Sequence, residues 1–289
     1  MLFDARALAF PVVYGQKMDV EEQQINRIIA WRAYEPDGLW FNVDFTLPSL
    51  DIIDTNSMEQ AMYLQKLLKT IQEMQSGFFE KFFGLAINTT VDFPVKWGFG
   101  TSSTLIHNLA SWAGINVFDF FYSVSNGSGY DIACAGSHSP LIFQRDVNGK
   151  PIIQETGFLK SFSDNLYLVY SGRKKSTEQH ITQFLKRHHG MKNEIKHISH
   201  ITNEILKEDS LEEFIDLLKD HEKIIGSILD QPPVQFEKFV SFNGAVKSLG
   251  AWGGDFLLAA TPENINYVSN YFEQFGLSTI LSFNKIVLQ

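Results

Sequence analysis

The residues of this chain that are best suited to chemistry lie in a glycine-rich segment, Pro94-Val-Lys-Trp-Gly-Phe-Gly-Thr-Ser-Ser-Thr104. Gly98 and Gly100 allow the backbone to take positive φ and to approach a ligand closely. Three hydroxyl-bearing residues follow at the start of a predicted helix, where free N–H groups and the positive end of the helix dipole favour an anion. They are Thr101, Ser102 and Ser103. The pattern indicates a phosphate-binding turn, and an ordinary glycine turn capped by serine explains it about equally well.

A second segment, Ser125-Asn-Gly-Ser-Gly-Tyr-Asp-Ile-Ala-Cys-Ala-Gly136, places one acidic residue, Asp131, between a glycine-rich turn and a stretch of small apolar residues. We expect the Asp131 carboxylate to be partly buried there. Because a buried carboxylate is costly without a partner or a chemical role, Asp131 is a candidate catalytic residue. The alternative is that Asp131 caps the N-terminus of a short helix over residues 132–135.

Two further segments are rich in glycine or in basic residues. The segment Lys247-Ser-Leu-Gly-Ala-Trp-Gly-Gly-Asp-Phe256 contains three glycines, and taken alone it favours a glycine-rich hairpin. The segment Ser171-Gly-Arg-Lys-Lys-Ser-Thr177 is the densest basic cluster of the chain, and a solvated loop explains it at least as well as an anionic-substrate site. Trp97 and Trp252 lie within candidate ligand segments, where we expect packing, with stacking on a ligand as the alternative.

The elements that must position these segments follow from the hydrophobic periodicity. Short runs of β-branched and aromatic residues predict strands, whereas apolar residues at spacings of three and four predict helices. Strands are predicted at residues 7–14, 39–45, 84–93, 141–143, 150–156, 166–170, 254–261 and 279–287, and helices at 57–83, 103–113, 262–275 and within 177–229. This order indicates an α+β protein of two lobes, with residues 1–160 and 161–289 as the predicted domains.

The composition narrows the class of protein. The 289 residues include 24 Lys+Arg and 33 Asp+Glu, a formal net charge of −9, so nucleic acids and anionic membranes are disfavoured as partners. The single cysteine, Cys134, excludes an internal disulfide and is expected to be an inert buried thiol. No apolar run reaches the ~18 residues of a membrane span. Asp4 and Arg6 interrupt the apolar N-terminal segment, so we expect a cytoplasmic protein without a signal peptide.

Taken together and in this order, the three glycine-rich segments resemble the motifs of the GHMP kinase superfamily. The family's second motif is P-x-x-x-G-L-G-S-S-A, which the segment from Pro94 to Thr104 resembles, with Phe99 for the leucine. The family's third motif is G-A-G-G-G, which Gly250-Ala-Trp-Gly-Gly254 resembles, with Trp252 in place of a glycine. The strings GYDIA and SLGAWGGD are similar to those of a distinct bacterial branch, and the positions of Lys96 and Asp255 favour the phosphomevalonate kinase side.

The resemblance implies a two-lobed fold, with a mixed sheet and helices in the N-terminal lobe and a ferredoxin-like C-terminal lobe. It also implies an ATP-dependent kinase that uses Mg²⁺. The residues that would hold the ATP phosphates are Gly98, Gly100, Thr101, Ser102 and Ser103. A hydroxyl of Thr101 or Ser102 would contact Mg²⁺, and Asp131 would deprotonate or orient the acceptor hydroxyl.

The resemblance also suggests where the acceptor binds. The residues implied are Lys96, Ser176, Thr177, Ala251 and Gly253. We expect a small-molecule acceptor, mevalonate or phosphomevalonate, and hence a role in isoprenoid-precursor synthesis. A sugar or homoserine is the alternative acceptor, and a non-catalytic nucleotide or metabolite binder is the alternative class. We expect a monomer or homodimer.

Two positions depart from the family's pattern. The first segment, from Met1 to Ala7, resembles only the V-L-D-G-A end of the family's first motif, so the motif's Lys and Glu are absent. A missing first strand would expose a sheet edge, and we expect a neighbouring element or a partner chain to cover it. Phe120 occupies the position of a Mg²⁺-binding Glu found in several relatives, and Asp119 is one residue out of register.

Overall fold

A computed structural model describes residues 4–289 of the chain except 25, 173–190, 251 and 253. The chain divides into two compact units, Tyr14–Gly136 and a second one that combines the residues up to Val13 with Ser137–Gln289. These units differ from the predicted domains, 1–160 and 161–289, because the N-terminal strand and residues 137–160 group with the C-terminal part. The predicted α+β class is confirmed, and each unit is described by itself.

The unit Tyr14–Gly136 is built on a five-stranded sheet of strand order β2-β6-β3-β4-β5. The strands are β2 (Gln16–Gln23), β3 (Ile28–Glu35), β4 (Gly38–Thr46), β5 (Ile52–Thr55) and β6 (Gly84–Val91). Only β3 and β6 run parallel, so the sheet is mixed, as expected. Alternate residues of β3 and β4, such as Trp31 and Val43, are buried against the helices.

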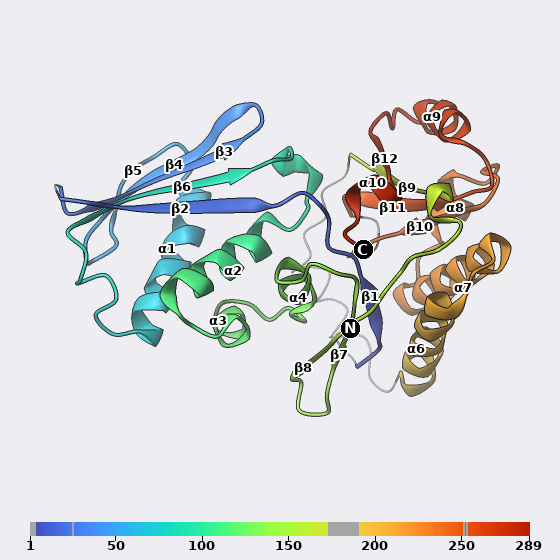
Figure 1. Cartoon of the computed structure of the whole chain (residues 1–289), viewed down its shortest axis with the longest axis horizontal. Coiled ribbons are helices and arrows are strands. Elements are labelled where there is room, and N and C mark those ends of the chain that lie inside the picture. The colour runs from blue at the N-terminus through green and yellow to red at the C-terminus, as the bar shows by residue number, and fades with distance from the viewer. Residues whose placement is uncertain (1–3, 25, 173–190, 251, 253) are drawn as a thin grey trace. The chain divides into compact units, whose positions relative to one another are not determined.

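Helices cover one face of this sheet (Figure 1). They are α1 (Met58–Met74), α2 (Thr101–Ala113), α3 (Val117–Val124) and α4 (Tyr130–Ala135). Leu64, Leu67, Leu68 and Ile71 form the buried stripe of α1 at spacings of three and four, as the sequence pattern predicts. The predicted helix 57–83 is longer than the real one, because α1 ends at Met74 and turns follow it.

The second unit contains two antiparallel sheets. The strands β1 (Ala7–Ala9), β7 (Leu141–Arg145) and β8 (Pro151–Glu155) form one, in the order β1-β7-β8. The strands β9 (Leu166–Tyr170), β10 (Ala245–Ser248), β11 (Phe256–Ala260) and β12 (Ile280–Ser282) form the other, in the order β10-β11-β9-β12. The helices are α6 (Lys192–Lys207), α7 (Leu211–Leu229), α8 (Val234–Lys238), α9 (Ile265–Glu273) and α10 (Phe283–Ile286). The predicted strand 279–287 is wrong in its second half, which forms α10.

Strand β1 is an edge strand, and α6 lies against it. Ser199 Oγ of α6 accepts a hydrogen bond from the backbone N–H of Arg6 at 3.1 Å, and Thr202 Oγ1 donates one to the Arg6 carbonyl at 3.0 Å. Arg6 directly precedes β1. These bonds satisfy the backbone groups of Arg6, next to the edge strand, and coverage of the edge itself stays a prediction.

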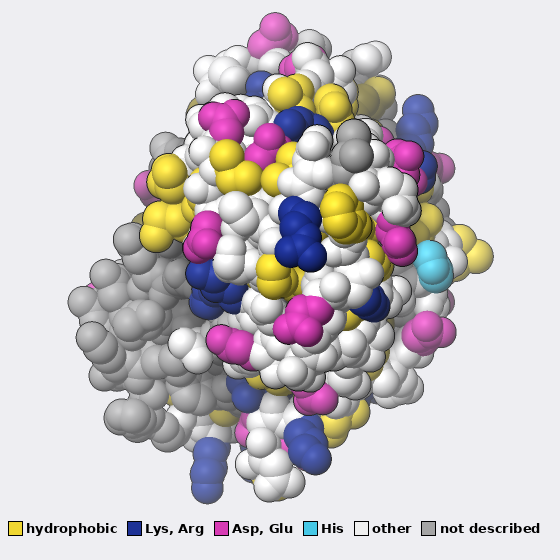
Figure 2. Space-filling view, turned by 90° about the vertical axis from the view of Figure 1, so that its left-hand side faces the viewer, with side chains coloured by type: hydrophobic (Ala, Val, Ile, Leu, Met, Phe, Trp, Pro, Cys, Tyr) yellow, Lys and Arg dark blue, Asp and Glu magenta, His cyan; other side chains and the backbone are white. Residues whose placement is uncertain are grey.

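The face of the molecule shown in Figure 2 is charged and mixed in sign. The face shown in Figure 2 carries Lys and Arg side chains among Asp and Glu side chains, with single hydrophobic residues between them. A surface of mixed sign gives a polyanion no continuous field to follow. In the described part of the chain no helix is both long enough and apolar enough to span a membrane.

Candidate functional site

The glycine turn after β6 has the conformation that the sequence predicts. A short 3₁₀ turn, η1 (Val95–Trp97), leads into Gly98 at φ 69°, and Gly100 follows at φ 83°. Both values lie in the left-handed region that only glycine adopts without cost. A Cβ atom added at Gly100 would meet nothing within 4 Å, so backbone conformation and not crowding requires a glycine there.

Helix α2 begins at Thr101 rather than at Ser103, because Gly100 is its N-cap. No side chain caps the helix, so the serine-capped turn considered for this segment is not what forms. The first intrahelical bond runs from the Thr104 N–H to the Gly100 carbonyl at 3.0 Å. The N–H groups of Thr101, Ser102 and Ser103 therefore have no intrahelical acceptor, and they point out of the positive end of the helix.

Aromatic packing holds this turn in place. The ring of Phe99 stacks on Tyr14 at a centroid distance of 5.7 Å and meets Phe93 edge-on at 5.6 Å. Trp97 packs edge-on against Tyr14 at 5.8 Å, which agrees with a packing role for this tryptophan. The Glu35 carboxylate accepts a bond from the Val95 N–H at 2.8 Å and fixes the start of the turn. Sequence reasoning missed Tyr14 and Glu35 as partners of this segment, because no local pattern links them to it.

Asp131 lies in the first turn of α4, whose N-cap is Gly129 at φ 85°. It is therefore inside the helix, and the alternative that Asp131 caps this helix is wrong. The expected partial burial is also wrong, because the residue is exposed. The protein around it raises the pKa of the Asp131 carboxyl by desolvation. The side chain nevertheless reaches solvent, and contact with water favours the ionised form of the carboxyl.

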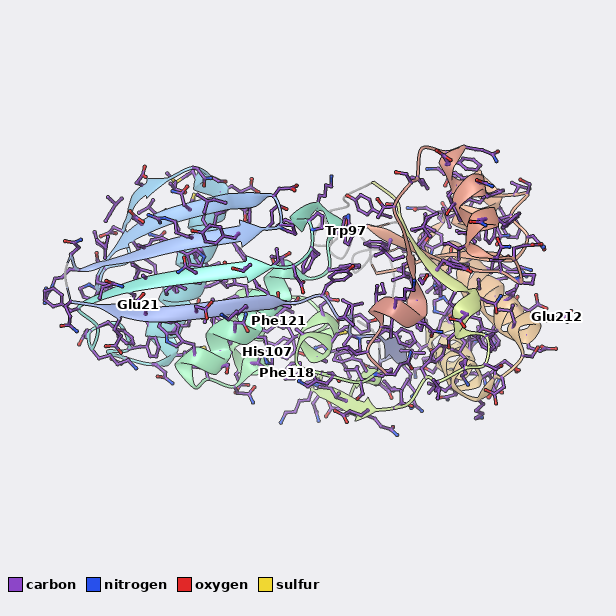
Figure 3. All side chains as sticks on the ribbon, turned by 45° about the horizontal axis from the view of Figure 1, so that its top comes forward. Glu21, Trp97, His107, Phe118, Phe121 and Glu212 are labelled. Carbon is purple, nitrogen blue, oxygen red and sulfur yellow. The ribbon has the colours of Figure 1, made fainter. Side chains whose placement is uncertain are left out.

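Helix α3 shapes the turn that precedes Asp131. A Cβ atom at Gly127 would lie 2.9 Å from the Phe121 ring, and one at Gly129 would lie 2.8 Å from the Tyr122 hydroxyl. That hydroxyl donates a hydrogen bond to the Ser128 carbonyl at 3.0 Å. The turn thus presses directly on α3, whose Phe118 and Phe121 are labelled in Figure 3. Sequence reasoning missed α3, although the glycines at 127 and 129 were the signal of a close approach.

Few of the described side chains near the glycine turn offer oxygen ligands for Mg²⁺. Phe120, at the position of the relatives' Glu, is fully buried in the core, and the neighbouring Asp119 is exposed on α3. Among the described residues no cluster of three or more His, Cys, Asp or Glu side chains could hold a metal ion. The hydroxyls of Thr101 and Ser102 fit an ion held mainly by phosphate oxygens and water, which is how Mg²⁺ binds in nucleotide sites.

Cys134 lies on α4 beside this segment. Burial raises the pKa of its thiol to about 12, and the charge of Asp131 adds to the shift. A thiol with this pKa is protonated at neutral pH and is a poor nucleophile. This agrees with the inert thiol that the sequence predicts, whereas the residue is half-buried and not fully buried as expected.

The third glycine-rich segment connects β10 to β11 in the other unit. Its Gly250 has φ 57°, and Trp252, in place of the family's glycine, has φ 56°. Four of the predicted acceptor residues lie outside the described residues: Ser176, Thr177, Ala251 and Gly253. The fifth, Lys96, is exposed in η1. The roles of all five stay predictions.

Comparison of the structure with solved structures identifies the fold. The mevalonate kinase of Methanococcus jannaschii superposes with a TM-score of 0.64 over 96% of this chain and 90% of that one, at 16% identity. The phosphomevalonate kinase of Streptococcus pneumoniae gives 0.64 over 96% and 91%, at 13% identity. The galactokinase of Lactococcus lactis complexed with galactose gives 0.60 over 99% and 88%, at 10% identity.

Sequence comparison finds no matching protein-family model and no matching curated protein. At 10% to 16% identity, the structural likeness is a likeness of fold, and it covers nearly the whole of both chains. It agrees with the three glycine-rich segments in their order along the chain. The chain therefore has the fold of the GHMP kinase superfamily.

Proposed function

We propose that this chain is a GHMP-type phosphotransferase that moves the γ-phosphoryl group of ATP to a small-molecule acceptor. The observation that carries the proposal is the start of α2. Two left-handed glycines open a helix whose first N–H groups have neither an intrahelical acceptor nor a side-chain cap. Such an end binds phosphate through its N–H groups and its dipole. The likeness of fold to mevalonate, phosphomevalonate and galactose kinases supports the same class.

The roles of the residues follow from this assignment. The N–H groups and hydroxyls of Thr101, Ser102 and Ser103 bind the phosphates, and Gly98 and Gly100 let the backbone approach them. ATP bound with Mg²⁺ supplies the transferable phosphoryl group and part of the charge neutralisation. The carboxylate of Asp131 accepts the proton from the acceptor hydroxyl or, for a phosphate acceptor, orients it. Lys96 offsets the charge of an anionic substrate.

For the acceptor we propose mevalonate or phosphomevalonate, and thus a cytoplasmic role in isoprenoid-precursor synthesis. The support is the likeness of fold to enzymes named for these substrates, together with the strings that contain Lys96 and Asp255. A sugar or homoserine remains the alternative acceptor. A monomer or homodimer that binds only small molecules fits the mixed surface charge.

A non-catalytic nucleotide binder is the second candidate function. Phe120 favours it, because a fully buried aromatic side chain replaces a carboxylate that helps to bind the metal in several relatives. A binder would keep the phosphate-binding turn and lose turnover. The two functions therefore differ in turnover and agree in nucleotide affinity.

The test is ADP release with Mg-ATP and each of mevalonate, phosphomevalonate, homoserine and galactose, alongside calorimetric binding of ATP. We expect acceptor-dependent release with one of the first two. ATP binding without release for any acceptor would favour the binder, and no ATP binding would overturn both functions. In Gly100→Val we expect ATP affinity to fall by more than tenfold, because a β-branched residue cannot adopt φ 83°. Gly276→Val, at φ 74° in the other unit, is the matched control.

A further inference from the structure

A buried carboxylate lies beside the third glycine-rich segment. Glu222, on α7, has a side chain that is only 3% exposed. Its Oε1 atom accepts two bonds, from Lys247 Nζ of β10 at 3.2 Å and from the indole Nε1–H of Trp252 at 3.0 Å. Its Oε2 atom is buried and has no hydrogen-bond partner in the described part of the chain. One oxygen of a single carboxylate thus joins a helix, a strand and the glycine-rich segment.

The backbone of Trp252 is the second observation. Its φ of 56° places a bulky aromatic residue in the left-handed region, where glycine is the usual residue. A conformation of this kind persists only where surrounding contacts hold it, and such residues are frequent at functional sites. The bond from the indole to Glu222 is a contact of this kind.

Among the described residues, one lysine, Lys247, carries a positive charge next to the Glu222 carboxylate. The Lys247 side chain is 14% exposed, and its ammonium also donates to the Ser248 carbonyl at 3.2 Å. His221, the preceding residue of α7, has a buried Nδ1 atom without a partner in the described part of the chain. Burial and the charge of Lys247 hold the pKa of His221 well below its usual value, so this histidine adds no positive charge at neutral pH. Among the residues that the structure describes, Lys247 is thus the cation that faces the carboxylate at hydrogen-bond distance.

We propose that Glu222 is a positioning residue, which holds Trp252 of the third glycine-rich segment in place through its hydrogen bond to the indole. The functional part of this inference rests on the proposed function and on the acceptor-binding role that the resemblance implies for Ala251 and Gly253 of that segment. We call this hydrogen bond the tether. It restricts the backbone at Trp252, a position where the family has a flexible glycine. A segment that is already ordered loses less conformational entropy when a substrate binds.

The free-energy cost of burying the Lys247–Glu222 ion pair supports a positioning role for Glu222. A buried ion pair is weak evidence for stability, because well-packed hydrophobic residues of similar size often stabilise a fold at least as well. Packing α7 against β10 therefore needs no carboxylate. A carboxylate is needed to accept the indole N–H at a fixed point, since a buried donor without an acceptor is unfavourable.

The first experiment measures the segment itself and does not depend on activity. Hydrogen exchange is followed in peptides that cover residues 247–256 in the wild type, Glu222→Gln and Trp252→Phe. Trp252→Phe keeps an aromatic ring and removes only the indole N–H. We expect exchange of these peptides to rise at least fivefold in both variants, while exchange of β9 and β11 stays unchanged in Trp252→Phe, which keeps the ion pair. Glu212→Gln, at an exposed position of the same helix (Figure 3), is the control and should not differ from the wild type.

The second experiment is steady-state kinetics of Trp252→Phe with the acceptor that the wild type accepts. We expect the acceptor KM to rise at least fivefold and the ATP KM to stay within twofold, with an unchanged melting temperature. Trp40→Phe, a half-buried tryptophan of the other unit, is the control for loss of an indole. A merely structural role would lower the melting temperature and leave the acceptor KM unchanged.

The outcomes separate the two proposals. Unchanged exchange of residues 247–256 in both variants would overturn the tether, whatever the activity. Raised exchange with a wild-type acceptor KM would overturn the positioning role. A wild type without turnover, but with raised exchange in the variants, would overturn the proposed function and keep the tether.

Discussion

The glycine turn before α2 and the glycine-rich segment between β10 and β11 are held by different forces. Aromatic rings pack around the first, with Phe99 stacked on Tyr14, and its helix N-terminus carries no cap. A buried ion pair and an indole hydrogen bond hold the second. Apolar packing fixes a backbone without using its N–H groups, so they stay available to a ligand. The buried Glu222 carboxylate orients the Trp252 side chain through a hydrogen bond, but its burial costs desolvation free energy.

The carboxylate of Asp131 provides the largest expected difference between the two regions. In Asp131→Asn we expect turnover to fall by about 10² to 10⁴-fold, the usual contribution of a general base, with ATP affinity unchanged. Asparagine keeps nearly the volume of the exposed Asp131 side chain and removes its charge. ADP release and calorimetry measure the two quantities.

Asp119→Asn, an exposed carboxylate on α3, is the matched control and should keep wild-type turnover. Equal turnover of Asp131→Asn and the wild type would remove Asp131 from the mechanism. It would also leave the first region as a binding surface only.

Removing one partner of the buried Lys247–Glu222 pair should lower the stability of the fold more than it lowers turnover. In Lys247→Met we expect a loss of about 3 to 5 kcal/mol in the free energy of unfolding, because the buried Glu222 carboxylate loses its counter-charge. Urea unfolding measures it. The double variant Lys247→Met, Glu222→Leu should recover most of the loss, since it removes both charges. A loss below ~1 kcal/mol in the single variant, as for exposed pairs, would mean that solvent screens the pair.

Crowding in the turn before Asp131, which lies in the same unit as the glycine turn before α2, gives a smaller effect. In Gly129→Ala the added methyl group would lie 2.8 Å from the Tyr122 hydroxyl and 3.2 Å from Phe118, at φ 85°. We expect a loss of about 1 to 3 kcal/mol in stability from overpacking. Gly276→Ala has a similar φ of 74° and nothing within 4 Å, so it measures the cost of conformation alone. Equal losses in the two variants would show that α3 does not press on the turn before Asp131.

The smallest effect is a pH dependence in the second region. The folded state lowers the pKa of His221 below its ordinary 6.5, because burial and Lys247 disfavour the imidazolium. Below about pH 6.5 the unfolded chain binds a proton that the folded chain resists, so stability falls as the pH falls, by at most about 1.4 kcal/mol per pH unit.

His221→Gln should flatten that slope, measured by urea unfolding between pH 5.5 and about 7.5. The pKa of His107, on α2, is also lowered by burial, so the variant should keep part of the slope. His138→Gln, at an exposed position, is the control. An unchanged slope in His221→Gln would show that His221 accepts a proton in the folded state.

The amino-acid sequence determined the features that depend on neighbours along the chain. The left-handed glycines Gly98 and Gly100 follow from composition, and the stripe of α1 and the strand β9 follow from periodicity. The glycine turn before α2 and the candidate residue Asp131 were recognisable for the same reason, because their residue types and spacing are local. The fold class followed from the order of the elements.

Tertiary structure decided what depends on residues far apart in the chain. Glu222 and Trp252 are 30 positions apart, and Glu35 and Val95 are 60 apart, so no local pattern pairs them. The exposure of Asp131 depends on which side of α4 faces the core. The six residues of this helix are too few for their pattern to predict that side. Packing between elements sets these features, since burial and hydrogen-bond partners are properties of the assembled chain.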